Sequence, residues 1–185
     1  MITSKKVKND FRRKARGVAV LLLDVDGVLT DGRIILDERG KEKKIFHVHD
    51  GQGIRWLLKA GVEVGIISGR SSGSVQARAR ELGITLLFQG IQDKWAVVQA
   101  LLKNKGWDLK QVAYVGDDLV DLPLLQRVGL PIGVPNGHPL THRSADYVTR
   151  KSGGWGAVRE VAEELLKSQG KWGEVVRGYS LVFEE

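Results

Sequence analysis

The chain has 185 residues, of which 42% are hydrophobic and 28% are charged, and this length and composition suit one globular domain with a sizeable core. It contains no cysteine, which excludes disulfides and zinc–thiolate sites and fits a cytoplasmic location. No apolar run approaches the roughly 20 residues that cross a membrane, and the charged N-terminus has no apolar signal-peptide core. We therefore expect no membrane partner and no signal peptide.

The formal net charge of +7 is concentrated at the N-terminus. Residues 1–17 carry seven basic side chains against Asp10 alone, whereas the rest of the chain has 22 basic and 21 acidic side chains. We interpret 1–17 as a basic N-terminal arm that is mostly a solvated, partly ordered terminus. The alternative is a non-catalytic subunit that binds nucleic acid through this arm, in which case binding would weaken with salt. We favour the first interpretation and expect no nucleic-acid partner.

From residue 18 to residue 168 apolar runs typical of strands alternate with helical segments. The first strand covers 18–23, a β-hairpin spans 33–48 around a turn at 37–40, and a helix follows over about 50–61. Further strands are predicted at 62–67, 85–88, 112–115, 130–134 and 147–149, and further helices at 71–82, 94–105, 119–128 and 157–167. This alternation predicts an α/β fold with a central parallel sheet between helices, followed by a C-terminal tail over 169–185.

The chemically reactive side chains come directly after the predicted strands. In doubly wound sheets, ligands bind outside the carboxyl ends of the strands. The candidates are, in chain order, Asp24 and Asp26, Ser68, Lys94, and then Asp117, Asp118 and Asp121. The pattern therefore predicts one functional site at one edge of the sheet.

Carboxylates that converge on one edge repel each other and need a cation, and hard oxygen ligands without cysteine favour Mg²⁺. Asp24, at the end of its strand, is a candidate nucleophile toward phosphorus, which would give an aspartyl-phosphate. Asp26 projects to the same side two residues later and is suited to protonating a leaving alkoxide and then activating water. Gly27 would let the backbone approach a phosphate closely.

The other candidates have matching roles in phosphoryl transfer. Ser68 could donate a hydrogen bond to a phosphoryl oxygen, and Lys94 could neutralise charge on the transferring group. Asp117 would complete the metal site, while Asp118 and Asp121 would either add a second ligand or orient Lys94. Each of these residues alone is compatible with an ordinary turn, cap or surface position. Their joint order at successive strand ends favours the functional interpretation.

The sequence DVDGVLT at 24–30, followed by Ser68, Lys94 and GDDLVD at 116–121, resembles the four motifs of the haloacid dehalogenase (HAD) superfamily phosphatases. The resemblance implies a Rossmann-like, three-layer fold and a Mg²⁺-dependent phosphoric monoester hydrolase. It implies that Asp24 is the nucleophile and Asp26 the acid and base. It also implies metal ligation by Asp24, by Asp117 and by the main-chain carbonyl of Asp26.

A narrower resemblance, to the 3-deoxy-D-manno-octulosonate (KDO) 8-phosphate phosphatase family, covers roughly residues 18–171. Its motifs are TDG at 30–32, DGQGI at 50–54, SGR at 68–70, LGI at 82–84, ADYVT at 145–149 and GGWGAVRE at 153–160. The resemblance implies hydrolysis of a sugar acid phosphate, most simply KDO 8-phosphate, in lipopolysaccharide biosynthesis. The candidate phosphate- and substrate-binding residues are Gly27, Thr30, His49, Asp50, Ser68, Gly69, Arg70 and Arg78.

That family has no cap domain, and its tetramer stands in for the missing lid. In this chain the 33–48 hairpin is too small to form a cap domain. The resemblance implies a homotetramer in which such hairpins join into a barrel, a neighbouring subunit helps to close the site, and the tail reaches a neighbouring site.

This chain differs from many family members before Asp50. They carry Asn and Arg there, whereas this chain reads Phe46-His47-Val48-His49, with His47 and His49 expected at the end of the hairpin. A protonated His49 could still bind an anion such as the sugar carboxylate. Arg70 and Arg78 are further candidates for anion contact, and Arg78 alternatively is a surface helix residue.

Two alternative functions remain open from the sequence. The first is hydrolysis of a related nine-carbon sugar acid phosphate. The second is a receiver-like phosphoacceptor signalling domain, which also uses clustered acids, Mg²⁺ and a lysine. Such a domain lacks a second carboxylate two residues after its phosphoacceptor, so Asp26 favours turnover.

Overall fold

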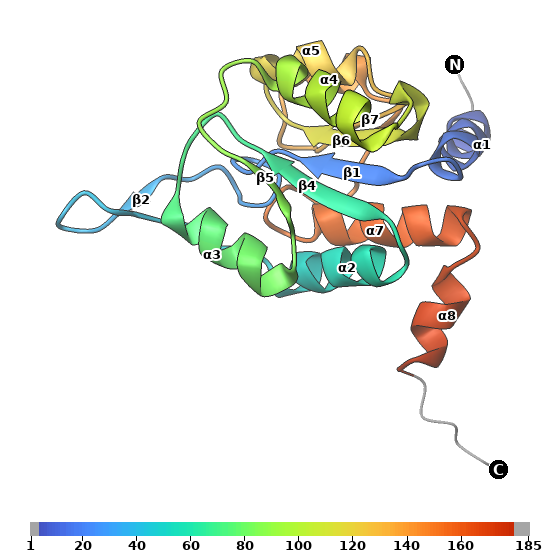
Figure 1. The fold of residues 1–185 in the computed structure, drawn as a ribbon, viewed down its shortest axis with the longest axis horizontal. Coiled ribbons are helices and arrows are strands. Elements are labelled where there is room, and N and C mark those ends of the chain that lie inside the picture. The colour runs from blue at the N-terminus through green and yellow to red at the C-terminus, as the bar shows by residue number, and fades with distance from the viewer. Residues whose placement is uncertain (1–3, 180–185) are drawn as a thin grey trace.

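The structure is a computed structural model that describes residues 4–179, with side chains from residue 10 onward. Its centre is a six-stranded sheet in the order β5-β4-β1-β6-β7-β8, in which every pair of neighbouring strands is parallel (Figure 1). The strands are β1 Val20–Leu23, β4 Glu63–Ile67, β5 Leu86–Phe88, β6 Val112–Gly116, β7 Leu130–Gly133 and β8 Tyr147–Val148. The predicted α/β class is confirmed.

Helices cover both faces of this sheet. They are α1 Ser4–Ala15, α2 Val48–Lys59, α3 Gly73–Leu82, α4 Lys94–Lys105, α5 Leu122–Leu125, α6 Pro139–Ser144, α7 Ala157–Ser168 and α8 Trp172–Arg177, with 3₁₀ turns η1 Leu109–Gln111 and η2 Leu119–Asp121. In Figure 1, α2, α3 and α7 lie on one face, and α4 and α5 lie on the other. The fold therefore has the three layers that the sequence predicts.

Successive side chains of the central strand β1 face the two helical layers alternately. Leu21 and Leu23 belong to the apolar cluster beneath α2 and α7, whereas Val20 and Leu22 belong to the cluster beneath α4 and α5. All four β1 side chains are buried, which is why this segment reads as a continuous apolar run. The strand that leads to Asp24 is thus held from both sides.

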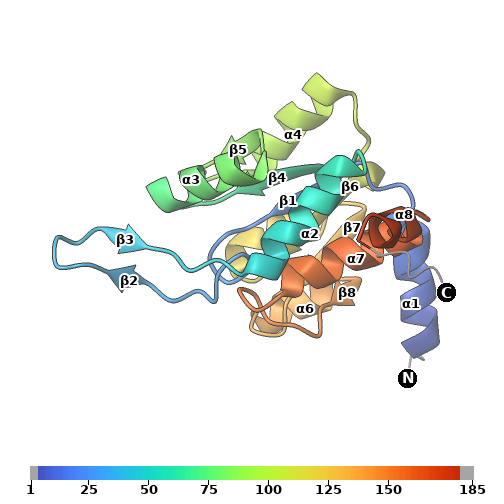
Figure 2. The same cartoon turned by 90° about the horizontal axis from the view of Figure 1, so that it is seen from below.

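A small antiparallel hairpin projects from the body of the molecule (Figure 2). It pairs β2 Ile35–Leu36 with β3 Glu42–Lys43 across a turn in which Asp37 accepts hydrogen bonds from the N–H groups of Arg39 and Lys41. The hairpin is shorter than the predicted 33–48, because α2 already begins at Val48 with His47 as its N-cap. His49 therefore lies in the first turn of a helix, and its expected place in the hairpin is wrong.

The predicted helix 119–128 is replaced by η2 and the short helix α5. Pro123 lies in the first turn of α5, where its missing N–H leaves no hydrogen bond unmade, and it would interrupt a helix that ran through it. Three helices, α1, α6 and α8, were not predicted.

Helix α1 lies within the predicted basic arm and packs against α7. Its Phe11 and Ala15 are buried in the same cluster as the inner face of α7. At the other end of the chain, α8 lies within the predicted tail, whose residues 180–185 are outside the described part of the structure, as are residues 1–3. Among the helices between residues 4 and 179, none has both the length and the apolar composition needed to cross a membrane.

Candidate active site

The register of the three central strands places the predicted motifs side by side. Leu23, at the end of β1, pairs with Ile66 of β4 and with Val115 of β6. Since the strands are parallel, the segments that leave them emerge at the same edge of the sheet. Asp24, Ser68 and Asp117 follow these strands directly, so the structure brings them to one edge as predicted.

Lys94 is the cation at the centre of this edge. Its ammonium group donates to Asp24 Oδ1 at 2.6 Å and to Asp121 Oδ1 at 2.7 Å, and it lies 3.2 Å from the hydroxyl oxygen of Tyr114. Lys94 opens α4 because Asp93 caps the helix by accepting the N–H groups of the next turn. Burial alone would lower the pKa of Lys94, but Asp24 and Asp121 raise it above its ordinary value. The lysine is thus held as a cation.

Asp121 is fully buried and accepts hydrogen bonds through both of its carboxylate oxygens. Its Oδ2 accepts the N–H groups of Asp117 at 2.9 Å and of Asp118 at 3.2 Å, while the Tyr114 hydroxyl donates to its Oδ1 at 2.5 Å. It therefore contacts Lys94, as the second of its two predicted roles requires. Asp118 instead accepts the N–H of the next residue at 2.7 Å and begins η2.

Three carboxylates gather closely enough to share a cation. One oxygen each from Asp24, Asp117 and Asp121 lie within 4.8 Å of one another. Burial raises the pKa of Asp117 to about 7, helped by the charges of Asp24, Asp121 and Asp118. Burial also raises the pKa of Asp24 to about 6, although Lys94 opposes this. A hard divalent cation would offset the burial and mutual repulsion of both carboxylates, so the donor set fits Mg²⁺.

Asp24 and Asp117 are better placed than Asp121 to be ligands. Both oxygens of Asp121 already accept hydrogen bonds from Lys94, Tyr114 and the backbone. The carbonyl of Asp26 stays a predicted ligand.

The turn after β1 is packed tightly against these carboxylates. Gly27 has a φ of 95°, and a Cβ atom there would collide with the carboxylate of Asp117. A Cβ at Gly153 would likewise collide with the carbonyl oxygen of Gly27. Asn136 joins the two segments, since its amide donates to the Gly27 carbonyl and accepts the Gly153 N–H, both at 2.8 Å. The segment 153–156 thus supports the turn after β1.

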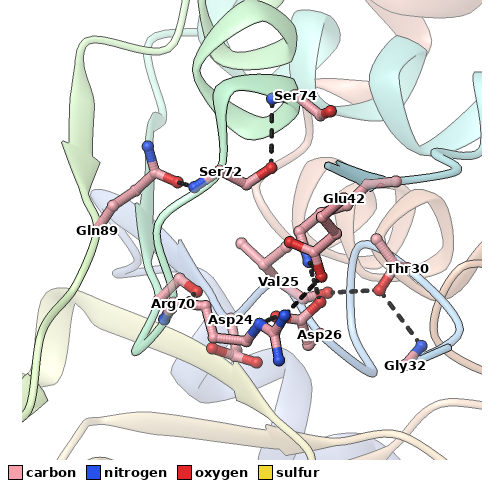
Figure 3. Close-up of polar contacts among 12 residues, drawn as sticks. Asp24, Val25, Asp26, Thr30, Gly32, Glu42, Arg70, Ser72, Ser74 and Gln89 are labelled. Atoms are coloured by element: carbon pink, nitrogen blue, oxygen red, sulfur yellow. Dashed lines mark hydrogen bonds and ion pairs between the residues drawn. The ribbon is translucent and has the colours of Figure 1, made fainter. Parts of the chain in front are cut away.

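Asp26 is surrounded by charges from the hairpin and from the loop after β4. Its Oδ1 accepts from the Lys44 ammonium at 2.5 Å, and the Arg70 Nε lies 3.7 Å from its Oδ2. Glu42 accepts from Lys44 at 3.2 Å and from Arg70 at 2.7 Å. Figure 3 shows Glu42 and Arg70 pointing toward Asp26, beside Asp24.

Ser68 and Thr30 are both buried at this edge. The Ser68 hydroxyl oxygen accepts the N–H of Arg70 at 3.2 Å, which shapes the loop that contains Gly69. The Thr30 hydroxyl donates to the Val25 carbonyl at 3.3 Å and accepts the N–H of Gly32 at 3.3 Å (Figure 3). In this structure Thr30 therefore closes the turn that carries Asp26 and Gly27.

Three predicted substrate-binding residues lie on α2 and α3, and no contact among the described residues joins them to Asp24, Lys94 or Asp117. Asp50 is buried and accepts the N–H of Arg159, at the start of α7, at 2.7 Å. Arg78 pairs with Glu81 at 2.8 Å. His49 is exposed.

Four residues at the site were not predicted from the sequence: Tyr114, Asn136, Glu42 and Lys44. A usable signal existed for Tyr114, because it is a hydroxyl-bearing residue inside an apolar strand that ends at the site. Glu42 and Lys44 alternate with exposed residues along the hairpin, but no local pattern shows that the hairpin folds back over the site.

Residues 86–161 match the haloacid dehalogenase-like hydrolase family. The 3-deoxy-D-manno-octulosonate 8-phosphate phosphatase KdsC of Escherichia coli K12 is 47% identical over 175 residues, which cover 95% of this chain and 93% of that protein.

Two solved structures are similar over nearly the whole chain. The phosphatase of the same name from Moraxella catarrhalis, in complex with magnesium, phosphate and KDO, has a TM-score of 0.91 at 43% identity and covers 93% of this chain and 99% of its own. The cobalt-bound phosphatase from Haemophilus influenzae has a TM-score of 0.83 at 37% identity and covers 93% of this chain and 96% of its own. The predicted resemblance is confirmed, and the chain belongs to the haloacid dehalogenase-like hydrolases, in the family of the 3-deoxy-D-manno-octulosonate 8-phosphate phosphatases.

Proposed function

We infer that this protein is a Mg²⁺-dependent phosphatase that hydrolyses KDO 8-phosphate to KDO and phosphate. The observation that carries this inference is the cluster of Asp24, Lys94 and Asp117 at the end of β1, in a chain 47% identical to KdsC. Magnesium held by Asp24 and Asp117 would neutralise phosphate charge and act as a Lewis acid.

In the first chemical step, a carboxylate oxygen of Asp24 attacks phosphorus, and the bond between phosphorus and the sugar oxygen breaks. Asp26 gives its proton to the departing alkoxide, so that the sugar leaves as a neutral alcohol. Lys94 lies 2.6 Å from Asp24 and is placed to stabilise negative charge on the transferring group. Ser68 and the backbone at Gly27 are proposed to bind the phosphoryl oxygens.

In the second step, water attacks the phosphorus of the aspartyl-phosphate. Asp26, now a carboxylate, takes a proton from that water, and the bond between phosphorus and Asp24 breaks. Phosphate leaves, Asp24 is again a carboxylate, and Asp26 is again protonated.

The alternatives differ from this function in testable ways. A receiver-like domain would retain its phosphoryl group, and a carboxylate at Asp26 beside the nucleophile disfavours that reading. A phosphatase of a nine-carbon sugar acid phosphate would share the mechanism and differ in affinity for the sugar. We propose that Arg70, Arg78, His49 and Asp50 serve sugar recognition, where the two substrates differ.

We also propose that the enzyme is a homotetramer that acts in the cytoplasm, in lipopolysaccharide biosynthesis. Ile34, Leu36 and Ile45 on the projecting hairpin are 58%, 59% and 62% exposed. Exposed apolar side chains gathered on one projection are typical of a surface that a partner covers. The hairpin of a second copy would supply matching apolar side chains.

The function is tested by phosphate release from KDO 8-phosphate in Mg²⁺ and in a chelator, compared with a nine-carbon sugar acid phosphate and a simple sugar phosphate. We expect Mg²⁺-dependent release with a clear preference for KDO 8-phosphate. Asp24→Asn should lower kcat by about a thousandfold or more, since it removes the nucleophile. Asp108→Asn, at the start of η1, is the matched control and should keep full activity. Retained turnover in Asp24→Asn would overturn the nucleophile assignment.

A further inference from the structure

Each of the two proposed catalytic aspartates forms an ion pair with a different lysine. Lys94 binds Asp24, and Lys44 binds Asp26. We propose that Lys44 is a positioning residue that fixes one oxygen of Asp26, so that the other oxygen carries the proton to the leaving group. This inference rests on the proposed function, because it assigns Lys44 a part in the same reaction.

The first support is a closed ring of four charged side chains. Lys44 donates to Asp26 Oδ1 at 2.5 Å and to Glu42 Oε1 at 3.2 Å. The same Glu42 oxygen accepts from Arg70 at 2.7 Å, and Arg70 Nε lies 3.7 Å from Asp26 Oδ2. Two cations alternate with two carboxyl groups around this ring, so Lys44 and Arg70 each lie between the same two carboxyl groups. Oδ1 of Asp26 can accept from Lys44 whether or not Oδ2 carries a proton.

The second support is burial. The Lys44 side chain is only 2% exposed, although it belongs to a hairpin that projects from the molecule, and Glu42 is 14% exposed. Lysine is almost never buried to this degree unless its charge is paired, because desolvation of an ammonium group is costly. The ion pairs with Asp26 and Glu42 therefore explain why the ammonium group of Lys44 can be buried.

The third support is the contrast with the neighbouring lysines. Lys41 and Lys43 lie on the same hairpin and are exposed. Side chains alternate between the two sides of a strand, so Glu42 and Lys44 share the side that faces Asp26, whereas Lys43 faces away. Lys43 makes no ion pair among the residues that the structure describes, which makes it the matched control.

The contacts of Asp26 differ between its two carboxyl oxygens. With Oδ1 held by Lys44 at the shorter distance, Oδ2 is the oxygen left with only the longer 3.7 Å approach of Arg70. Without Lys44 the carboxyl group would rotate among several orientations, and the productive one would be populated for only part of the time. The loss should appear only where proton transfer to the leaving group limits the rate.

The test compares leaving groups in the full-length enzyme. The values of kcat/KM for Lys44→Met, Lys44→Arg and Lys43→Met are measured with KDO 8-phosphate, with ribose 5-phosphate and with p-nitrophenyl phosphate. The first two are alkyl esters whose alkoxide needs a proton, and the second lacks a carboxylate. The third releases a stabilised phenolate that needs none. The ratio kcat/KM covers the steps up to ester cleavage, in which the leaving group is expelled.

We expect Lys44→Met to lower kcat/KM by about tenfold or more for both alkyl esters and to change it much less for p-nitrophenyl phosphate. Lys44→Arg should retain the wild-type dependence on leaving group, and Lys43→Met should match wild type on all three. An equal loss on every substrate, or no loss on any, would overturn the proposal. A loss confined to KDO 8-phosphate would also overturn it, since Lys44 would then bind the sugar carboxylate. If the wild-type enzyme hydrolysed none of the three esters, the proposed function itself would fail.

Discussion

At the scale of single residues, Tyr114 is one of the four site residues that the sequence did not predict. It is fully buried in β6, and its hydroxyl donates to Asp121 at 2.5 Å while lying 3.2 Å from the Lys94 ammonium. Burial raises the pKa of Tyr114 well above its ordinary value, and Asp121 and Asp24 raise it further, so the phenol stays a donor. Tyr114 therefore holds Asp121 in the orientation that places Lys94 against Asp24.

We expect Tyr114→Phe to reduce both stability and turnover. It removes a donor from a buried carboxylate, which costs about 1–3 kcal/mol of unfolding free energy, and it frees Lys94 to shift toward Asp121. The loss should fall on kcat, with little change in KM, because we propose that Lys94 stabilises charge on the transferring phosphoryl group. Thermal unfolding and steady-state kinetics measure the two effects.

Tyr147→Phe is the matched control, because the Tyr147 hydroxyl also donates to a buried carboxylate, that of Glu160, away from Lys94. Glu160 would still accept the N–H groups of Arg150 and Lys151, which hold the loop before Gly153. Tyr147→Phe should therefore lower the unfolding temperature and leave kcat close to wild type. If both variants reduced kcat equally, Tyr114 would have only a general structural role.

At the scale of elements, α7 holds the loop before Gly153, and this loop supports the turn after β1. Glu160, in the first turn of α7, is 8% exposed and accepts the N–H groups of Arg150 at 3.0 Å and of Lys151 at 3.1 Å. These hydrogen bonds fix the segment just before Gly153, which packs against the Gly27 carbonyl. The position of the turn after β1 therefore depends on the carboxylate of Glu160, which lies outside the site.

The pKa of Glu160 gives this contact a defined pH dependence. Burial alone would raise the pKa, but the hydrogen bonds from Tyr147, Arg150 and Lys151 lower it below the ordinary value of 4.5. The folded protein thus favours the carboxylate more than the unfolded chain does. Its contribution to stability is present above about pH 4.5 and is lost as the pH falls through the lowered pKa.

Glu160→Gln should therefore lower the unfolding free energy at pH 7, and the difference from wild type should shrink as the pH falls below about 4.5. Urea unfolding at several pH values measures this difference. Glu38→Gln, on the exposed hairpin turn, should show no difference at any pH. A gap between Glu160→Gln and wild type that stayed constant down to acid pH would contradict the role of the carboxylate charge.

The predictions from sequence succeeded where a residue's place follows from one element. Asp24, Ser68 and Asp117 come directly after buried parallel strands, and such strands fix where the next residue emerges. The prediction failed at His49, because α2 begins earlier than the glycines at 51 and 53 suggested. Helix α1 was missed because its charged residues obscure the apolar pair Phe11 and Ala15, which lie one turn apart.

Lys44 could not be placed from the sequence for a different reason. Its contact with Asp26 joins residues 18 positions apart and depends on the direction in which the hairpin leaves the body. Nothing in the residues 33–47 specifies that direction locally. It is set by the turn that Thr30 closes and by the ion pairs that form once Glu42 and Arg70 meet.

At the scale of the whole molecule, the site draws on β1, β4, β6 and α4, and on the hairpin. The first four are bound together by the two apolar clusters, whereas the hairpin reaches the site through the ion pairs of Glu42 and Lys44. Its outer apolar side chains have no cover in a single chain. We propose that a neighbouring copy covers these side chains and so holds the hairpin, and with it Lys44, in place over Asp26.

We propose that the hairpin links assembly to catalysis, and this proposal can be tested. Leu36→Asp and Ile45→Asp each replace an exposed apolar side chain of the hairpin with a charged one. Leu36 is 59% exposed and Ile45 is 62% exposed. If the wild-type protein is the proposed tetramer, we expect both variants to form smaller species in multi-angle light scattering and to lose activity in proportion. Leu140→Asp, on an exposed apolar residue of α6, should keep the assembly. A wild-type protein that is monomeric at every concentration would refute the tetramer. Hairpin variants that dissociate but remain fully active would instead show that one chain holds Lys44 in place unaided.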